Sequence, residues 1–230
     1  MKDLIYRSAI DLGFFAVGVA SAERLPELDH LNSWLKKNFD ATMSWMRKDP
    51  ALRCDPSSLL AGAKSVICVA HEYRFARGRD YHKIVKKKLI RVVDALKTKV
   101  PNARFKTCVD TSPVLEKALA VRSGIGWRGK HSIVIHPDRG SYFVLGEIIT
   151  DIEIEPDKPV ENRCGDCNKC IEACPTGTIV EPYIIDANRC ISYLTIEHEG
   201  PIDRKLTKHI KPEQYGCELC QEACPYNKGE

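Results

Sequence analysis

Eight of the eleven cysteines lie in the last third of this chain, and their spacing constrains it more than any other feature. The first run, Cys164–Pro175, reads C-G-D-C-N-K-C-I-E-A-C-P, and the second, Cys217–Pro225, reads C-E-L-C-Q-E-A-C-P. Cys190 stands alone between the two runs. The spacing C-x₂-C-x₂-C-x₃-C-P is typical of chains that bind two [4Fe-4S] clusters, where three thiolates of a run hold one cluster and the fourth holds the other.

Bacterial ferredoxins carry this pattern, and their crossover rule predicts how the cysteines divide. The second run lacks only the first cysteine of the motif, which Cys190 can supply. The predicted ligands of cluster 1 are Cys164, Cys167, Cys170 and Cys224. Those of cluster 2 are Cys174, Cys190, Cys217 and Cys220. Because no cysteine of the region is left over, we expect two complete [4Fe-4S] clusters.

Zinc and disulfide bonds are the alternatives to iron–sulfur clusters. Pairs spaced C-x₂-C also build Cys₄ zinc sites, but zinc ribbons use pairs of pairs and need no third cysteine before a Cys-Pro step. Disulfides persist in oxidising compartments. The sequence shows neither a signal peptide nor a transmembrane run, so we expect a cytoplasmic protein without membrane contact. The cysteine region is therefore predicted to carry electrons.

The chain is long enough for a second domain ahead of the clusters. We expect a ferredoxin-like domain over residues 156–230 and a separate domain over 1–155. In the N-terminal part, apolar strand-like runs such as 65–70 and 142–149 alternate with helical periods such as 80–96. This mixture predicts an α/β or α+β fold. Further strands are expected over 14–20, 102–109 and 132–136, and further helices over 2–12 and 25–46.

Asp110 is the residue of the N-terminal part with the most suggestive position. It follows a predicted strand and precedes a predicted helix that Ser112 would cap, with Pro113 as its first residue. Open sheets bind ligands at such strand ends, but an isolated aspartate here is more often a turn or capping residue. No G-x-G-x-x-G or Walker motif occurs, so nicotinamide, Rossmann-type flavin binding and nucleotide hydrolysis lack support.

Positive charge is concentrated in one segment of the chain. Residues 71–110 carry a net charge of +8, whereas the whole chain carries +4. The segment contains a basic amphipathic helix, so it indicates either a polyanionic partner or a solvated lysine face. The lysines predicted to face outward are Lys83, Lys86, Lys87 and Lys88.

Five motifs together resemble the epoxyqueuosine reductase family. They are V-D-T-S-P-V-L-E-K (109–117), G-I-G-W-R-G-K (124–130), G-S-Y-F-V-L-G-E (140–147), D-Y-H (80–82) and C-I-S-Y-L-T-I-E (190–197). With the cysteine pattern, they cover nearly the whole chain in order. The resemblance implies an N-terminal domain that binds cobalamin and a C-terminal one with two [4Fe-4S] clusters. It also implies kinship with the corrinoid-dependent reductive dehalogenases.

The resemblance implies an activity and roles for individual residues. The expected reaction reduces epoxyqueuosine to queuosine at the wobble position of a tRNA anticodon, with Asp110 as the proton donor. Electrons would come from an external donor such as flavodoxin or ferredoxin, and a monomer is expected. The lysines at 83, 86, 87 and 88 would grip tRNA phosphates. The expected cobalamin contacts are Arg53, Tyr81, His82, Asp110, Trp127, Gly129, Lys130, Ser132, Val134, Ser192 and Cys217.

The family pattern differs from this sequence at its end. Many members continue past the last cluster cysteine into a helical repeat extension that helps to hold tRNA, whereas this sequence stops six residues after Cys224. We therefore expect a short form of the family. Two alternatives stay open: a corrinoid-dependent reductase of another, small-molecule or halogenated substrate, and a dicluster electron carrier without enzymatic activity. A basic surface leading to Asp110 favours tRNA, and a closed apolar pocket favours a small substrate.

Overall fold

The computed structural model describes residues 1–73 and 80–227, which divide between two compact units. The first unit consists of Met1–Glu27, Ala51–Trp127 and Tyr142–Glu161. The second consists of Leu28–Pro50, Arg128–Ser141 and Asn162–Glu230. These units are not the same division as the expected domains 1–155 and 156–230, since two N-terminal segments group with the cysteine region. The boundary between functional domains stays a prediction.

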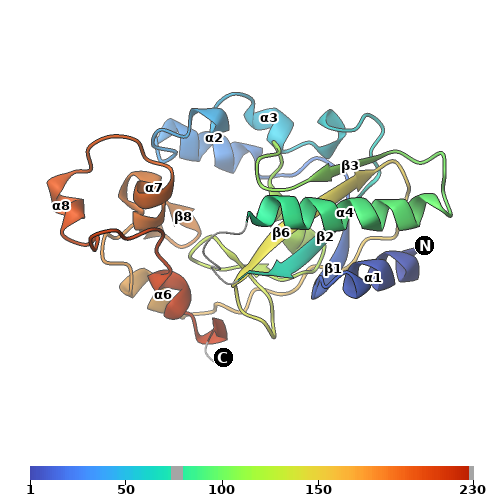
Figure 1. Cartoon of the computed structure of the whole chain (residues 1–230). Coiled ribbons are helices and arrows are strands. Elements are labelled where there is room, and N and C mark those ends of the chain that lie inside the picture. Colours follow the sequence, from blue (N-terminus) through green and yellow to red (C-terminus); the bar gives the residue numbers. More distant parts are fainter. Residues whose placement is uncertain (74–79, 228–230) are drawn as a thin grey trace. The chain divides into compact units, whose positions relative to one another are not determined.

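A four-stranded sheet forms the centre of the first unit (Figure 1). Its strands are β1 (Ala16–Ser21), β2 (Ser65–Glu72), β3 (Phe105–Cys108) and β6 (Phe143–Thr150), in the order β1-β2-β6-β3. All three strand pairs are antiparallel, so the unit belongs to the α+β class rather than the α/β class. Strand β2 lies inside the sheet and is buried at six consecutive positions, which explains its continuous apolar run.

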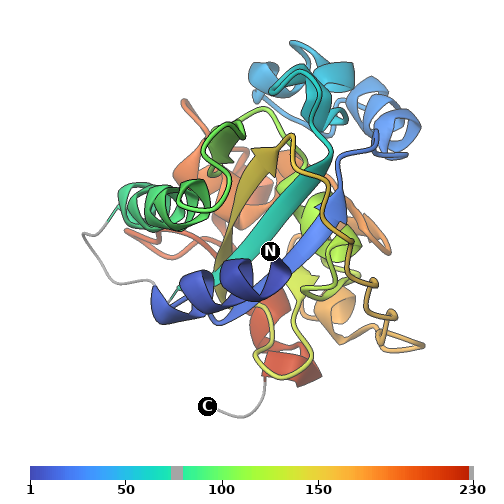
Figure 2. The ribbon, with the colours of Figure 1, turned by 90° about the vertical axis from the view of Figure 1, so that its right-hand side faces the viewer.

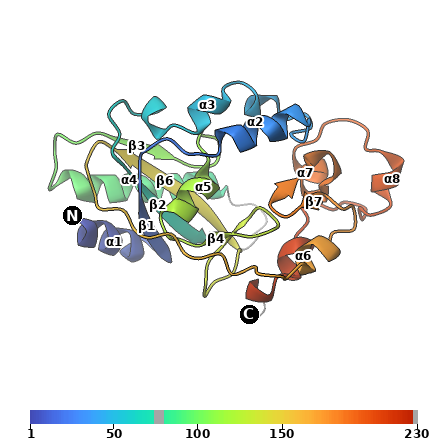
Figure 3. The ribbon, with the colours of Figure 1, turned by 180° about the vertical axis from the view of Figure 1, so that it is seen from behind.

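Helices cover both faces of this sheet. On one face lie α1 (Lys2–Asp11) and α4 (Tyr81–Lys97), and on the other lies α5 (Glu116–Arg122). Figure 1 shows the sheet from the side that α4 covers, Figure 3 shows it from behind with α5 labelled, and Figure 2 shows the same ribbon turned by 90°. The predicted apolar side of α4 is confirmed, because its members are all buried: Val85, Leu89, Val92, Val93 and Leu96. These side chains join those of α1 and the sheet in one core.

Small residues allow close packing on the α5 face. A Cβ atom on Gly18 of β1 would lie 2.1 Å from the carbonyl oxygen of Ser123, so only glycine lets β1 pass the end of α5. The three cysteines outside the cluster region are all buried as small apolar side chains: Cys54 directly after α3, Cys68 on β2 and Cys108 on β3.

The second unit is built from short elements around the cysteine runs. Helices α6 (Lys169–Glu172) and α9 (Leu219–Glu222) each contain the second cysteine of a C-x₂-C step, Cys170 and Cys220, and they pack against each other. The N-terminal segment joins this unit through the Trp34 indole N–H, which donates to the Ile185 carbonyl oxygen at 2.6 Å. The other elements of the unit are α2 (Leu28–Lys36), η1 (Ser44–Met46), β5 (Val134–Ile135), β7 (Ile179–Glu181), β8 (Ile184–Ile185), η3 (Ala187–Arg189), α7 (Ile191–Ile196), α8 (Arg204–Thr207) and η4 (Pro225–Asn227).

Three predicted elements differ in the structure. The helix expected over 25–46 is wrong in length, because α2 ends at Lys36 and positive φ angles at Asn38 and Ala41 turn the chain. The helix expected from Ser112 begins only at Glu116. The strand expected over 132–136 shrinks to β5 because Ser132 has a φ of 63°. The remaining short elements are α3 (Pro50–Arg53), η2 (Pro56–Ser58) and β4 (Trp127–Arg128). Within the described residues, no helix has the length and apolar character needed to cross a membrane.

Candidate active site and cluster-binding region

Asp110 lies directly after β3 in a strained backbone conformation. Its φ of 46° is in the left-handed region, which Asp and Asn tolerate better than most residues but which still costs free energy. Its side chain is 54% exposed, so its carboxyl group can reach a ligand. Strained residues of this kind occur disproportionately at functional sites.

His82 bridges two carboxylates at the start of α4. Its Nε2 lies 2.9 Å from Asp110 Oδ2, and its Nδ1 lies 2.9 Å from Asp80 Oδ1. Asp80 also caps α4 by accepting the backbone N–H of His82. Burial alone would lower the pKa of His82, but the hydrogen bonds with Asp110 and Asp80 outweigh it and raise that pKa. A protonated His82 donates from both ring nitrogens and can exchange a proton with Asp110.

Tyr81 and Arg53 lie in the same unit as Asp80, His82 and Asp110. The Tyr81 ring stacks on the His82 ring with centroids 4.0 Å apart, and burial followed by the Asp110 charge raises the pKa of its hydroxyl. The Arg53 carbonyl oxygen accepts the N–H of Leu115 at 3.2 Å, which ties the end of α3 to the loop that follows Asp110. The structure therefore gathers four of the predicted site residues in the first unit.

Two functional candidates escaped the sequence analysis, Glu116 and Glu147. Glu116 Oε1 accepts the backbone N–H of Asp110. Glu147 on β6 is completely buried. Both glutamates belong to the motifs at 109–117 and 140–147, yet neither received a role. The sequence held a signal for Glu147, because it lies inside an otherwise apolar strand. A buried glutamate is rare unless it is paired, so such a residue is a candidate for a functional role.

Predicted cobalamin contacts of the second unit lie on one tight turn between β4 and β5. The Ser132 N–H donates to the Gly129 carbonyl oxygen at 2.8 Å, and a Cβ atom on Gly129 would lie 2.7 Å from Ile135. The Ser132 hydroxyl donates to the Tyr183 carbonyl oxygen, and the Lys130 ammonium donates to Asn168. The side chains of Trp127 and Val134 are almost completely buried, so at Val134 the backbone is the group left to meet a ligand.

Ser192 and Cys217 lie on neighbouring segments of the second unit. Ser192 belongs to α7, and the N–H of Gly216 donates to the Thr195 hydroxyl of the same helix at 2.9 Å. This bond holds the second cysteine run against α7. The contacts of these two residues with cobalamin stay a prediction.

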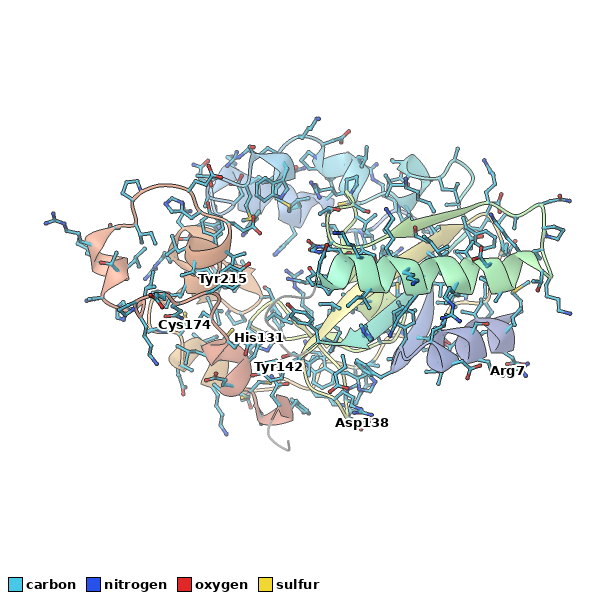
Figure 4. The ribbon with its side chains drawn as sticks, in the orientation of Figure 1. Arg7, His131, Asp138, Tyr142, Cys174 and Tyr215 are labelled. Carbon is cyan, nitrogen blue, oxygen red and sulfur yellow. The ribbon has the colours of Figure 1, made fainter. Side chains whose placement is uncertain are left out.

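One cavity of about 270 Å³ is lined by the four sulfurs predicted for cluster 1. Its cysteines come from both runs: Cys164, Cys167, Cys170 and Cys224. Lys130, His131 and Arg163 also line it, so positive and polar groups surround the predicted cluster. Figure 4 labels His131 and, also in the second unit, Cys174 of the second predicted set.

The cysteines predicted for cluster 2 act on one another electrostatically. Burial and then the neighbouring Cys190, Cys217 and Cys174 raise the pKa of Cys220 to about 12. In the part of the chain that the structure describes, no three His, Cys, Asp or Glu side chains converge as the ligands of a single metal ion. The cavity of the first set has room for a cofactor larger than one metal ion, and the assignment of each sulfur to an iron stays a prediction.

The four predicted tRNA-contacting lysines do not have equal surroundings. Lys83, Lys86 and Lys87 are exposed on α4. Lys88 is only half-exposed, because its ammonium lies 3.4 Å from His71 Nε2 and 5.6 Å from the centre of the Phe14 ring. Three lysines therefore present their charge to solvent, and the fourth packs against the body of the first unit.

Comparisons with known proteins match both parts of the chain. Residues 163–227 match the family described as 4Fe-4S double cluster binding domain. Residues 53–111 match Epoxyqueuosine reductase QueG, DUF1730. The first match defines the C-terminal part of the chain as an iron–sulfur domain for two [4Fe-4S] clusters.

Relatives at the level of the whole chain give the family. The epoxyqueuosine reductase of Cellulophaga algicola is 37% identical over 99% of this chain and 79% of its own length. That of Escherichia coli is 39% identical over 95% of this chain, which spans only 63% of the relative. This chain belongs to the epoxyqueuosine reductase family.

Solved structures agree with this result. An epoxyqueuosine reductase from Streptococcus thermophilus superposes with a TM-score of 0.92 at 33% identity, covering 100% of this chain and 67% of that one. A complex of epoxyqueuosine reductase with an epoxyqueuosine-modified tRNA-Tyr stem loop has a TM-score of 0.91 at 34% identity, covering 99% and 65%. A catabolic reductive dehalogenase shares the fold, with a TM-score of 0.61 at 14% identity, covering 98% and 32%.

Proposed function

We propose that this chain reduces epoxyqueuosine to queuosine in tRNA, with Asp110 as the proton donor. The observation that carries the proposal is the match over 99% of the chain to a relative solved with an epoxyqueuosine-modified tRNA stem loop. The Bacillus subtilis relative, 33% identical, was solved with an aspartate catalytic loop swung out of its active site. Asp110 is the aspartate to which we assign that role, because it has an exposed carboxyl group on a strained loop.

The chemistry requires a proton donor, an electron supply and a strong reductant. Conversion of an epoxide to an alkene releases the oxygen as water and consumes two electrons and two protons. Cobalamin, when bound, would supply the strongly reducing metal centre that C–O cleavage needs. The residues proposed to hold it are those predicted from the resemblance: Arg53, Tyr81, His82, Asp110, Trp127, Gly129, Lys130, Ser132, Val134, Ser192 and Cys217.

The first-unit residues fit this role chemically. The Asp110 carboxyl group is exposed, so it can donate a proton to the oxygen that leaves. His82 lies within hydrogen-bond distance of it and can return a proton after each transfer. Asp80 holds the imidazole in place through its other nitrogen. Tyr81 stacks on the same ring and shields one of its faces from water.

Single electrons would reach the active site through the two clusters. An external one-electron donor such as flavodoxin or ferredoxin would supply them, because the double-cluster domain stores and passes electrons singly. We propose a monomer in the cytoplasm, with the anticodon region of tRNA held partly by lysines of α4. These lysines would position the phosphates without reading the sequence.

The test is anaerobic reconstitution of the full chain with iron, sulfide and cobalamin, followed by incubation with reductant and epoxyqueuosine-containing tRNA. Mass spectrometry of the digested tRNA should show the loss of one oxygen. Asp110→Asn should lower the rate by roughly 10²-fold or more, the usual contribution of general acid catalysis. Asp11→Asn, an exposed aspartate at the end of α1, is the matched control and should retain full activity.

The two alternatives predict different outcomes of the same experiment. If cobalamin binds and the tRNA is unchanged, a corrinoid-dependent reductase of another substrate becomes the better interpretation. If cobalamin does not bind, only the dicluster electron carrier remains.

A further inference from the structure

Glu147 is the most deeply buried acidic residue of the first unit. Its side chain has no exposed area, and its carboxyl group faces the carboxyl group of Glu116. The strand register places it between Cys68 of β2 and Cys108 of β3, whose thiols are weak donors at best. A carboxylate in such a place would be very costly, so Glu147 keeps its proton.

Glu116 on α5 is the acidic neighbour that acts most strongly on Glu147. Burial and then the charge of Glu116 raise the pKa of Glu147 well above its ordinary value. Burial, opposed in part by the hydrogen bond from Asp110, raises the pKa of Glu116 to about 7. Two carboxyl groups this close in a dry interior do not both ionise readily. The first negative charge of the pair therefore resides on Glu116, and it develops as the pH rises through about 7.

Glu116 connects this pair to the proposed acid. Its Oε1 accepts the backbone N–H of Asp110, the residue held at a φ of 46°. A charged acceptor makes this hydrogen bond stronger than a neutral one. The other ionisable groups that act on the pair are Cys68 of β2, Cys108 of β3, Tyr81 of α4, Lys117 of α5 and the Asp110 carboxyl itself.

We propose that Glu116 is a positioning residue that anchors the Asp110 backbone. In this proposal the neighbouring Glu147 stays protonated, so the negative charge that strengthens the hydrogen bond to Asp110 can reside on Glu116. This role deepens the proposed function, on which its catalytic meaning rests. Glu116 touches neither substrate nor cofactor in this scheme. It fixes the direction in which the Asp110 carboxyl group points.

The direct test is hydrogen exchange at the Asp110 amide in the reconstituted full chain, resolved to single residues. Corrected for intrinsic exchange, protection should rise roughly fivefold as Glu116 ionises between pH 6 and 8. Glu116→Gln keeps an acceptor without charge and should abolish the pH-dependent step, whereas Glu116→Ala should remove protection at both pH values. Glu155→Gln, an exposed glutamate of the same unit, is the matched control and should behave as wild type.

A second measurement addresses Glu147. The infrared carbonyl band of a protonated carboxyl group should persist at pH 8 in the wild-type protein and disappear in Glu147→Gln. Loss of that band at pH 8 in the wild type, or equal Asp110 protection in wild type and Glu116→Ala, would overturn the proposal. Neither measurement needs tRNA turnover, so a failure of the proposed function would be seen separately.

A kinetic readout separates positioning from a purely structural role. If the proposed function holds, Glu116→Gln should lower kcat several-fold and leave the KM for tRNA unchanged, because the variant disturbs the acid and not the binding surface. An equal loss in an Asp110→Asn background would contradict the proposal, since Glu116 acts only through Asp110.

Discussion

At the scale of single residues, burial gives three neighbouring carboxyl groups different properties. Asp110 is 54% exposed, Glu116 is partly buried and Glu147 is completely buried. An exposed carboxyl group exchanges protons with solvent and ligands, whereas a buried one resists ionisation. The Asp110 carboxyl group thus contacts His82, and its backbone N–H donates to Glu116 of α5, whose acidic neighbour Glu147 lies on β6.

The raised pKa of Glu116 predicts how the folding stability of the chain depends on pH. The pKa of Glu116 is raised to about 7 in the folded chain, so the unfolded chain ionises first and folding stability falls as the pH rises from about 4.5 to 7. The loss attributable to Glu116 should be at most about 3 kcal/mol, since its side chain keeps some contact with water. Denaturant unfolding across this range should show the slope in wild type and Glu155→Gln. An undiminished slope in Glu116→Gln would contradict the assignment.

At the scale of elements, α4 carries two functions on opposite sides. Its apolar side completes the core, its first turn presents His82 to Asp110, and its polar side exposes Lys83, Lys86 and Lys87. The whole helix could be predicted from the sequence, because the apolar period and the Asp80 cap act locally. The start of α5 could not, because the Ser112-Pro113 signal competes with a tertiary requirement: Asp110 must turn back so that its N–H meets Glu116.

Because the lysines of α4 differ in exposure, substitutions at these positions should differ in their effects on tRNA binding and on stability. Changing Lys83, Lys86 and Lys87 together to Gln should weaken tRNA binding and lower the salt dependence of log K by up to about 0.9 for each lost phosphate contact. Lys88→Gln should instead reduce stability with little change in the salt slope, because Lys88 packs against His71 and Phe14. Binding titrations at several salt concentrations distinguish the two. Equal salt slopes in the triple variant and wild type would indicate a merely solvated face.

At the scale of the whole molecule, the sequence predicted the double-cluster domain but not which segments pack around it. Cysteine spacing is a local property, so the double-cluster domain could be read from residues 164–225. The grouping of segments 28–50 and 128–141 with that domain could not, because it depends on contacts such as Trp34 with Ile185 that no local pattern encodes. The burial of Glu147 could have been predicted from its place inside an apolar strand, but its proximity to Glu116 could not, because Glu116 lies on another element.

The predicted crossover of ligands between the two cysteine runs can be tested by the iron content of double cysteine variants. Cys170 and Cys174 are four residues apart, yet they are assigned to different clusters, whereas Cys174 and Cys190 are assigned to the same one. The double variant Cys174→Ser/Cys190→Ser should therefore keep about four of about eight irons, because only cluster 2 is lost. Cys170→Ser/Cys174→Ser should lose nearly all iron, because each cluster loses a ligand. Iron analysis and electron paramagnetic resonance of the reduced proteins check both. The reverse order of iron contents, with about four irons kept in Cys170→Ser/Cys174→Ser and nearly none in Cys174→Ser/Cys190→Ser, would show that the runs bind their clusters without crossing.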